Sequence, residues 1–193
     1  MAKSEADSYQ IVETFFEESD PRLSVYVGID PGSEGAIAFL CGRHHAVIDM
    51  PVIKETLTKK TKGGNKATRT IYDPSLITTV FSLVRENRHR ATVCLEKSSP
   101  RPTDGVITAF SVGTGFGMWP LFLHSQGIRL EQDLFVPAVW KRKMALIGKD
   151  KEASRALAQR LWPGAPLTRK GDHNRAEALL IAEVGRREWG DHR

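Results

Sequence analysis

Apolar and polar positions along the chain follow the pattern of an α/β domain. Leu23–Asp30 is a β-prone run that ends in Asp-Pro-Gly, and Glu34–Leu40 and Ala46–Met50 predict two further strands with a turn between them. Ala91–Glu96 is a fourth apolar run, and Leu134–Val136 predicts a short fifth strand. Strands interleaved with helical segments predict a sheet covered by helices.

Helical spacing of apolar residues predicts the remaining elements. The first twenty residues carry four apolar side chains at this spacing, and we expect a short, solvated amphipathic helix there. Asp73 and Pro74 begin a second helix with an N-cap and a proline in the first turn. Further helices are expected over 106–123, from Pro137 through Lys143, from Asp150, and over about His173–Arg187.

The order β-β-β-α-β-α-β-α is the order of a ribonuclease-H-like (RNase-H-like) fold. We therefore predict an α/β domain with a five-stranded mixed sheet flanked by helices, by analogy alone. It has no internal repeat and no linker of domain scale. Residues 1–21 form an acidic N-terminal appendage, and residues 22–193 form the main domain.

Residues 51–72 predict a basic β-hairpin inserted into this domain. Thr-rich, β-prone arms flank Gly63 and Gly64, and such a glycine pair is a hairpin signal. Because the tip has no large apolar residue, we expect it to project into solvent. Its basic residues are Lys59, Lys60, Lys62, Lys66 and Arg69.

The charge is distributed unevenly over the 193 residues. The chain has 28 Lys and Arg against 23 Asp and Glu, a formal charge of +5. Residues 1–20 carry −5, which leaves +10 on the remainder. A basic body of this kind fits a polyanionic partner, although solubility explains it equally well. Apolar content of 40% excludes disordered and collagen-like chains.

Neither cysteine usage nor targeting signals suggest export. Cys41 and Cys94 sit at or in apolar runs without metal-binding spacing, so we expect buried, reduced thiols. The acidic start has no pattern of a signal or transit peptide. Residues Val106–Leu123 carry no charge, but their glycines and Pro120 favour a buried core helix over a membrane span.

Two acids end otherwise apolar strands. Asp30 follows the first strand and Glu96 the fourth. Asp30 can simply start a turn, and Glu96 can pair with Lys97. If the two strands are neighbours, however, the carboxylates converge, and a divalent cation relieves their repulsion.

The last helix supplies a second pair of candidate ligands. His173 and Glu177 lie four residues apart on one helical face. The alternative is that they pair locally while Asp172 caps the helix; Asp172 can itself be the ligand in place of His173. Asp, Glu and His donors together suit Mg²⁺ or Mn²⁺, and two such ions suit phosphodiester hydrolysis. Lys141 and Lys151 are candidates for a positive wall beside them.

Four blocks of sequence in this order resemble the RuvC-type Holliday-junction resolvases, closest to the plant chloroplast (monokaryotic chloroplast) branch. They are YVGIDPGSEGAIAFL, CLEKSSPRPTDG, VWKRKMALIGKDKEASRALAQRLWP and DHNRAEALLIA. The resemblance spans roughly residues 25–185. It implies a homodimeric DNA endonuclease that resolves four-way junctions by paired symmetric cuts, with two Mg²⁺ per site, Mn²⁺ substituting, and no membrane partner.

The resemblance also implies site residues. The catalytic group is Asp30, Glu96, His173, Glu177 and Lys151, of which the first four hold metal. The basic hairpin embraces DNA, and the loop after Glu96 reads bases at the junction centre. The predicted DNA-binding residues are Lys59, Lys60, Lys62, Lys66, Arg69, Lys97, Ser98, Arg101 and Lys141.

Some features depart from the family. The family tends to have Gln after the strand-ending acid and an aromatic residue between the prolines, where this chain has Lys97 and Arg101. Two alternatives remain, a non-cleaving protein that binds branched DNA and an RNase-H-like nuclease on another substrate. We expect a bacterial or phage nucleoid in the cytoplasm, or a plastid if the chain is a trimmed mature form.

Overall fold

A five-stranded mixed sheet forms the centre of the molecule. The computed structural model describes residues 3–60, 66–131 and 135–190. The strand order is β3-β2-β1-β6-β7. β1, β2 and β3 are antiparallel neighbours, whereas β6 and β7 run parallel to β1. The strands are β1 (Val25–Asp30), β2 (Ala36–Cys41), β3 (His44–Asp49), β6 (Ala91–Leu95) and β7 (Arg129–Glu131). This arrangement confirms the predicted RNase-H-like fold.

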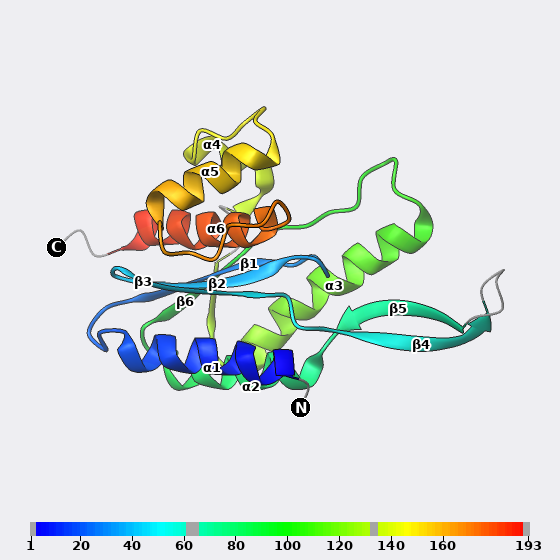
Figure 1. Ribbon diagram of the computed structural model, residues 1–193, viewed down its shortest axis with the longest axis horizontal. Coiled ribbons are helices and arrows are strands. Elements are labelled where there is room, and N and C mark those ends of the chain that lie inside the picture. Colours follow the sequence, from blue (N-terminus) through cyan, green and yellow to red (C-terminus); the bar gives the residue numbers. More distant parts are fainter. Residues whose placement is uncertain (1–2, 61–65, 132–134, 191–193) are drawn as a thin grey trace.

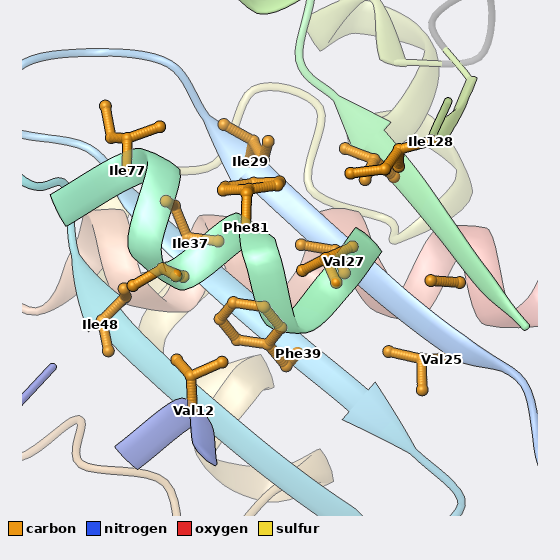
Figure 2. Packing of buried hydrophobic residues seen from close by; sticks show 14 of the residues in the cluster. Val12, Val25, Val27, Ile29, Ile37, Phe39, Ile48, Ile77, Phe81 and Ile128 are labelled. Carbon is orange, nitrogen blue, oxygen red and sulfur yellow. The ribbon is translucent and has the colours of Figure 1, made fainter. Parts of the chain in front are cut away.

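Helices cover both faces of the sheet (Figure 1). One face carries α1 (Lys3–Glu18), α2 (Pro74–Glu86) and the end of α3 (Val106–Ser125). The other carries α4 (Pro137–Lys143), α5 (Lys151–Leu161) and α6 (His173–Trp189). Successive side chains along a strand point to opposite faces of the sheet, so they pack into two separate hydrophobic cores. Figure 2 shows Val27, Ile29 and Phe39 packed with Phe81 of α2 in the first core.

Close packing of α6 on the sheet depends on glycine. A Cβ built on Gly28 of β1 would lie 2.6 Å from the backbone nitrogen of Ala182 and closer still to the carbonyl oxygen of Ala178. The helix therefore lies directly over β1, and it also packs on β2. This approach fixes the position of α6 relative to the end of β1.

The predicted hairpin is present as a separate two-stranded sheet. β4 (Val52–Lys60) pairs antiparallel with β5 (Lys66–Tyr72), and the pair projects from one side of the molecule (Figure 1). Lys62 and the glycine pair lie outside the described residues. At its base, the hydroxyl of Tyr72 donates a hydrogen bond to the carbonyl of Pro31, the residue after Asp30.

The N-terminal helix is not solvated, and this part of the sequence interpretation is wrong. Val12 and Phe15 of α1 are buried in the first core, and the Phe15 and Phe39 ring centroids lie 5.8 Å apart. The end of the segment is tied down as well, because the Arg90 guanidinium donates to the carbonyl of Asp20 at 2.9 Å. Its apolar stripe covers sheet surface that would otherwise face water.

The helix α3 is only partly buried, contrary to expectation. Trp119 and Leu123 are fully buried, but Val106, Ile107 and Phe110 are 86%, 84% and 75% exposed. A 20-residue helix is about 30 Å long, whereas a six-residue strand spans about 20 Å. The first half of α3 therefore extends beyond the sheet, on the same side as the hairpin (Figure 1). By length and composition alone this helix could cross a membrane, but its buried end belongs to the domain core.

The fifth strand lies earlier than predicted. β7 covers Arg129–Glu131 and pairs with β6, after a turn in which Gly127 has a φ of 63°. Leu134 lies outside the described residues. Phe135 is apolar for another reason, since it is fully buried in the second core beside the ring of Trp189.

Candidate active site at the ends of the central strands

The two strand-ending acids lie side by side. β1 and β6 are parallel neighbours, with Ile29 paired to Leu95, and the backbone N–H of Glu96 donates to the carbonyl of Ile29 at 3.0 Å. The carboxyl ends of both strands therefore meet at one edge of the sheet. The condition that the sequence prediction required, adjacency of the two strands, is confirmed.

Glu177 of α6 adds a third carboxylate. It is buried, one turn into the helix that lies over β1. Its charge raises the pKa of Asp30 and of Glu96. Three acids from three elements far apart in sequence thus share one electrostatic environment.

Burial makes the ionised forms of Asp30 and Glu96 unfavourable. Burial raises the pKa of Asp30 to about 6. The backbone N–H of Gly32, which donates to the carboxylate at 3.4 Å, acts in the opposite direction and lowers this pKa. Burial and the charge of Asp30 raise the pKa of Glu96 to about 7. Both groups therefore titrate near neutral pH, as expected where carboxylates are desolvated together.

Two lysines neutralise part of this cluster. The Lys141 ammonium forms an ion pair with Glu177, with 2.9 Å between Nζ and Oε1. The Lys151 ammonium lies 3.0 Å from Nε2 of His173. Lys141, expected among the DNA-binding residues, thus lies inside the acid cluster, whereas Lys151 stands exposed beside His173.

Asp172 is engaged elsewhere. Its carboxylate is buried and accepts hydrogen bonds from the backbone N–H and the side chain of Arg169, at 2.7 and 2.9 Å. Its backbone starts α6, yet its side chain makes no capping hydrogen bond. Of the two candidate ligands in this turn, Asp172 is thus already engaged by Arg169.

Sequence reasoning missed two site residues. The indole N–H of Trp140 donates to Oε1 of Glu96 at 2.8 Å. The buried hydroxyl of Ser154 lies 3.3 Å from Oε1 of Glu177. The sequence could have indicated Trp140, because the N–H of a buried indole usually finds a polar partner. For Ser154 the sequence offers only its position one helical turn after Lys151.

The donor set fits a hard divalent cation. Within residues 3–60, 66–131 and 135–190, no three Asp, Glu, His or Cys side chains are gathered tightly enough to hold an ion as they stand. Glu177 and His173 instead contact Lys141 and Lys151. The chemistry of the donors nevertheless suits Mg²⁺, because three of the four candidate ligands are carboxylates.

Most predicted DNA-binding residues whose side chains the structure describes are exposed. Lys66, Lys97 and Arg101 are exposed, and Ser98 is half-buried. Arg69 pairs with Glu55 across the hairpin at 2.5 Å, an exposed contact that contributes little to stability. Lys59 and Lys60 end β4, but their side chains, like Lys62, lie outside the described part.

Comparison with curated proteins supports the resemblance carried by the four sequence blocks. The chain is 34% identical over 149 residues to the chloroplastic Holliday junction resolvase MOC1 of Chlamydomonas reinhardtii, a match over 70% of this chain and 17% of that protein. An alanine–tRNA ligase of Roseiflexus sp. is 39% identical over 75 residues, covering 38% of this chain and 8% of the ligase. This chain therefore matches only a small part of each relative. The match to MOC1 confirms the resemblance to RuvC-type resolvases near the chloroplast branch.

Family profiles and solved structures add no support to the assignment. No family profile matches the chain. Two structures of Thermus thermophilus RuvC, one in complex with a Holliday junction substrate, superimpose with a TM-score of 0.45 at 16% and 15% identity. These superpositions cover 86% of this chain and 96% of RuvC. Because that score is low, the fold assignment rests on the strand order and pairing described above.

Proposed function

We propose that the chain is a metal-dependent endonuclease that resolves four-way DNA junctions. The observation that carries the proposal is that Asp30 and Glu96 end adjacent parallel strands, where the charge of Glu177 acts on both. The chain also resembles a Holliday junction resolvase in sequence. Desolvated acids such as Asp30 and Glu96, whose pKa values are raised, are costly to a fold, and such acids are enriched at sites that bind a cation or catalyse.

Asp30, Glu96, His173 and Glu177 are the proposed metal ligands, with Mg²⁺ the ion and Mn²⁺ its substitute. Two bound ions would supply electrostatic stabilisation of the attacking and leaving oxygens of a phosphodiester. The protein holds the carboxylates in place through the sheet and α6. Lys151, exposed beside His173, is the proposed contact of the scissile phosphate.

Basic segments around the site would bind the DNA arms. The hairpin residues Lys59, Lys60, Lys62, Lys66 and Arg69 and the loop residues Lys97, Ser98 and Arg101 are the proposed contacts. Lys141 would join these contacts once a cation replaced its ammonium as the partner of Glu177. The charge of +10 outside the first twenty residues supports a polyanionic partner.

A second copy of the chain is the proposed partner of the exposed half of α3. Val106, Ile107 and Phe110 form an exposed apolar surface on a segment without charge. Built Cβ atoms on Gly113 and Gly117 meet nothing within 4 Å, so another helix can approach closely. A two-fold dimer would give two identical sites, which paired symmetric cuts require.

The cellular compartment of this chain is proposed from a relative alone. The name of the algal relative places that protein in the chloroplast, in line with a plastid setting for this chain. A bacterial or phage nucleoid remains the other prediction. Both are places where recombining DNA forms four-way junctions.

Two alternatives make different predictions. A non-cleaving protein that binds branched DNA would bind junctions without a Mg²⁺ effect. A nuclease on another substrate would cut hybrids or linear duplex as well as it cuts junctions. The acid cluster favours a nuclease over a binding module, because binding alone has no use for buried carboxylates.

The test uses labelled four-way junction and matched linear duplex, with Mg²⁺ or EDTA. We expect paired symmetric nicks in the junction alone, lost in EDTA and in Asp30→Asn and Glu96→Gln, while both variants still bind junctions. Glu34→Gln, an exposed acid in the turn after Asp30, is the matched control and should cut normally. Normal cutting by Asp30→Asn would remove the site assignment, and tight binding without cutting would favour the binding protein.

A further inference from the structure

Trp140 is attached to one of the proposed metal ligands. It is fully buried on α4, and its indole N–H donates to Oε1 of Glu96 at 2.8 Å. In the part of the chain that the structure describes, this is the hydrogen bond that the Glu96 carboxylate accepts. One carboxylate oxygen is thereby held and the other stays available.

Burial alone does not explain this contact. The indole nitrogens of Trp119 and Trp162 are also buried, yet neither has a hydrogen-bond partner among the described residues. The fold thus tolerates buried indoles without partners. The orientation of Trp140 toward Glu96 is therefore a specific feature of α4.

The backbone around Glu96 holds α4 in register with this carboxylate. The N–H of Lys97 donates to the carbonyl of Phe135, two residues before α4, at 3.0 Å. Pro137 then opens the helix, which suits its fixed φ. A backbone bond and an indole bond thus join the α4 segment to two successive residues at the end of β6.

The next residue of α4 reaches a second acid. Lys141 pairs with Glu177, and its ammonium also lies 5.1 Å from the centre of the Trp140 ring. Successive residues of one short helix therefore contact acids on β6 and on α6. No other described element makes side-chain contacts of this kind with both.

We propose that Trp140 is a positioning residue that orients the Glu96 carboxylate toward the cation. The inference rests on the proposed function, because it concerns how that site binds metal. The terminal torsion of a glutamate is broad and roughly two-fold, so an untethered carboxylate samples many orientations. A hydrogen bond to one oxygen removes that freedom before the cation arrives, and loss of such a contact typically costs about 10- to 100-fold in metal affinity or activity.

The experiment compares Trp140→Phe with Trp119→Phe in the full chain. Both variants keep an aromatic ring and lose an indole N–H, but only the first N–H has an acceptor. Calorimetric titration with Mn²⁺, without DNA, should give about 10- to 100-fold weaker binding for Trp140→Phe and unchanged binding for Trp119→Phe. Junction affinity in EDTA should stay the same in both. Cleavage by Trp140→Phe should recover as the metal concentration is raised.

The outcomes separate the two proposals. If the wild-type chain binds no Mn²⁺, the proposed metal-dependent function fails. If the wild type binds and Trp140→Phe binds equally well, only the role of Trp140 is overturned. A loss of cleavage that persists at saturating metal with unchanged Mn²⁺ affinity also overturns it.

A measurement on the wild type covers the case in which Trp140→Phe does not fold. In the NMR spectrum of the ¹⁵N-labelled protein, Mg²⁺ should shift the indole N–H signal of Trp140, because its acceptor becomes a ligand. The signal of Trp119, in the core on the opposite face, should stay in place. An unchanged Trp140 signal at saturating Mg²⁺ contradicts the proposal.

Discussion

Lys141 forms its ion pair with Glu177 within the acid cluster, where the two side chains are 30% and 11% exposed. The ammonium also lowers the pKa of Asp30 and of Glu96. It therefore acts as an internal counter-charge for three carboxylates. A cation bound by those acids would take over this role and would free Lys141 to contact a phosphate.

Replacement of Lys141 should make the metal-free protein depend on Mg²⁺ for stability. We expect Lys141→Met to lose about 1–3 kcal/mol in EDTA, because Glu177 loses its charged partner while buried, and to regain most of it with Mg²⁺. Thermal melts in EDTA and in Mg²⁺ measure this. Lys143→Met is the control: Lys143 pairs with Glu188 at the surface, where an ion pair contributes less than about 1 kcal/mol. Equal losses in the two variants, insensitive to Mg²⁺, would contradict the role of Lys141.

Stability of the metal-free protein should fall as pH rises toward neutrality. The pKa values of Asp30 and Glu96 are about 6 and 7 in the fold, above their ordinary values of 3.8 and 4.5. Between these limits the folded state binds more protons than the unfolded state, so the free energy of unfolding decreases with pH. The favourable contribution is full below about pH 4 and is lost above about pH 7.

Melting temperatures in EDTA between pH 5 and pH 8, for the wild type and the double variant Asp30→Asn, Glu96→Gln, check this. The wild type should lose stability relative to the variant as pH rises, by about 2–4 °C for each kcal/mol. Mg²⁺ should reduce the difference at high pH, because it binds the ionised acids. Parallel pH profiles for the two proteins in EDTA would show that these carboxylates are not desolvated.

Neutral hairpin variants should bind junctions more weakly and with a shallower salt dependence. Replacing Lys59, Lys60, Lys62 and Lys66 by Gln removes up to four phosphate contacts, each worth about 0.9 in the slope of log K against log salt. Junction binding measured by fluorescence anisotropy across salt concentrations gives the slope. Arg43→Gln, at the exposed turn between β2 and β3, should leave the slope unchanged. An unchanged slope in the hairpin variant would mean that the hairpin does not contact phosphate.

Charge on the exposed half of α3 should convert a dimer to a monomer. Ile107→Asp with Phe110→Asp places two carboxylates on the proposed interface without touching either core. Sedimentation velocity should show a dimer for the wild type and a monomer for the variant, with paired cuts replaced by single nicks. Ile147→Asp, at an apolar residue that is exposed elsewhere, is the control and should stay dimeric. A dimer in both variants would place the interface on another surface.

Much of the candidate site was predictable because its signal is local. Asp30 and Glu96 stand out as the acids that end two apolar strands, and the structure supplies the adjacency that their convergence required. The spacing of His173 and Glu177 places both on one side of α6. The hairpin and the caps at Asp73 and Asp150 were likewise readable from a few adjacent residues.

Contacts between elements were not predictable in the same way. Helix α1 has the apolar stripe of any amphipathic helix, and only the sheet beside it determines that Val12 and Phe15 are buried. For α3 the sequence predicted a buried helix, but the apolar residues of its first half extend past the sheet and are exposed. The fifth strand was predicted in the wrong place because Phe135, an apolar residue of the predicted strand, packs in the core beside Trp189 and does not belong to a strand.

By itself, the sequence determined the strand and helix types, their order and the acids at the strand ends, because periodicity and capping act within a few residues. Tertiary structure alone decided that Trp140 holds Glu96, that Lys141 pairs with Glu177, and that Arg169 engages Asp172. These contacts depend on how α4 and α6 lie relative to the sheet. That arrangement is set by close packing at Gly28 and by backbone bonds such as Lys97 to Phe135, which no local pattern encodes.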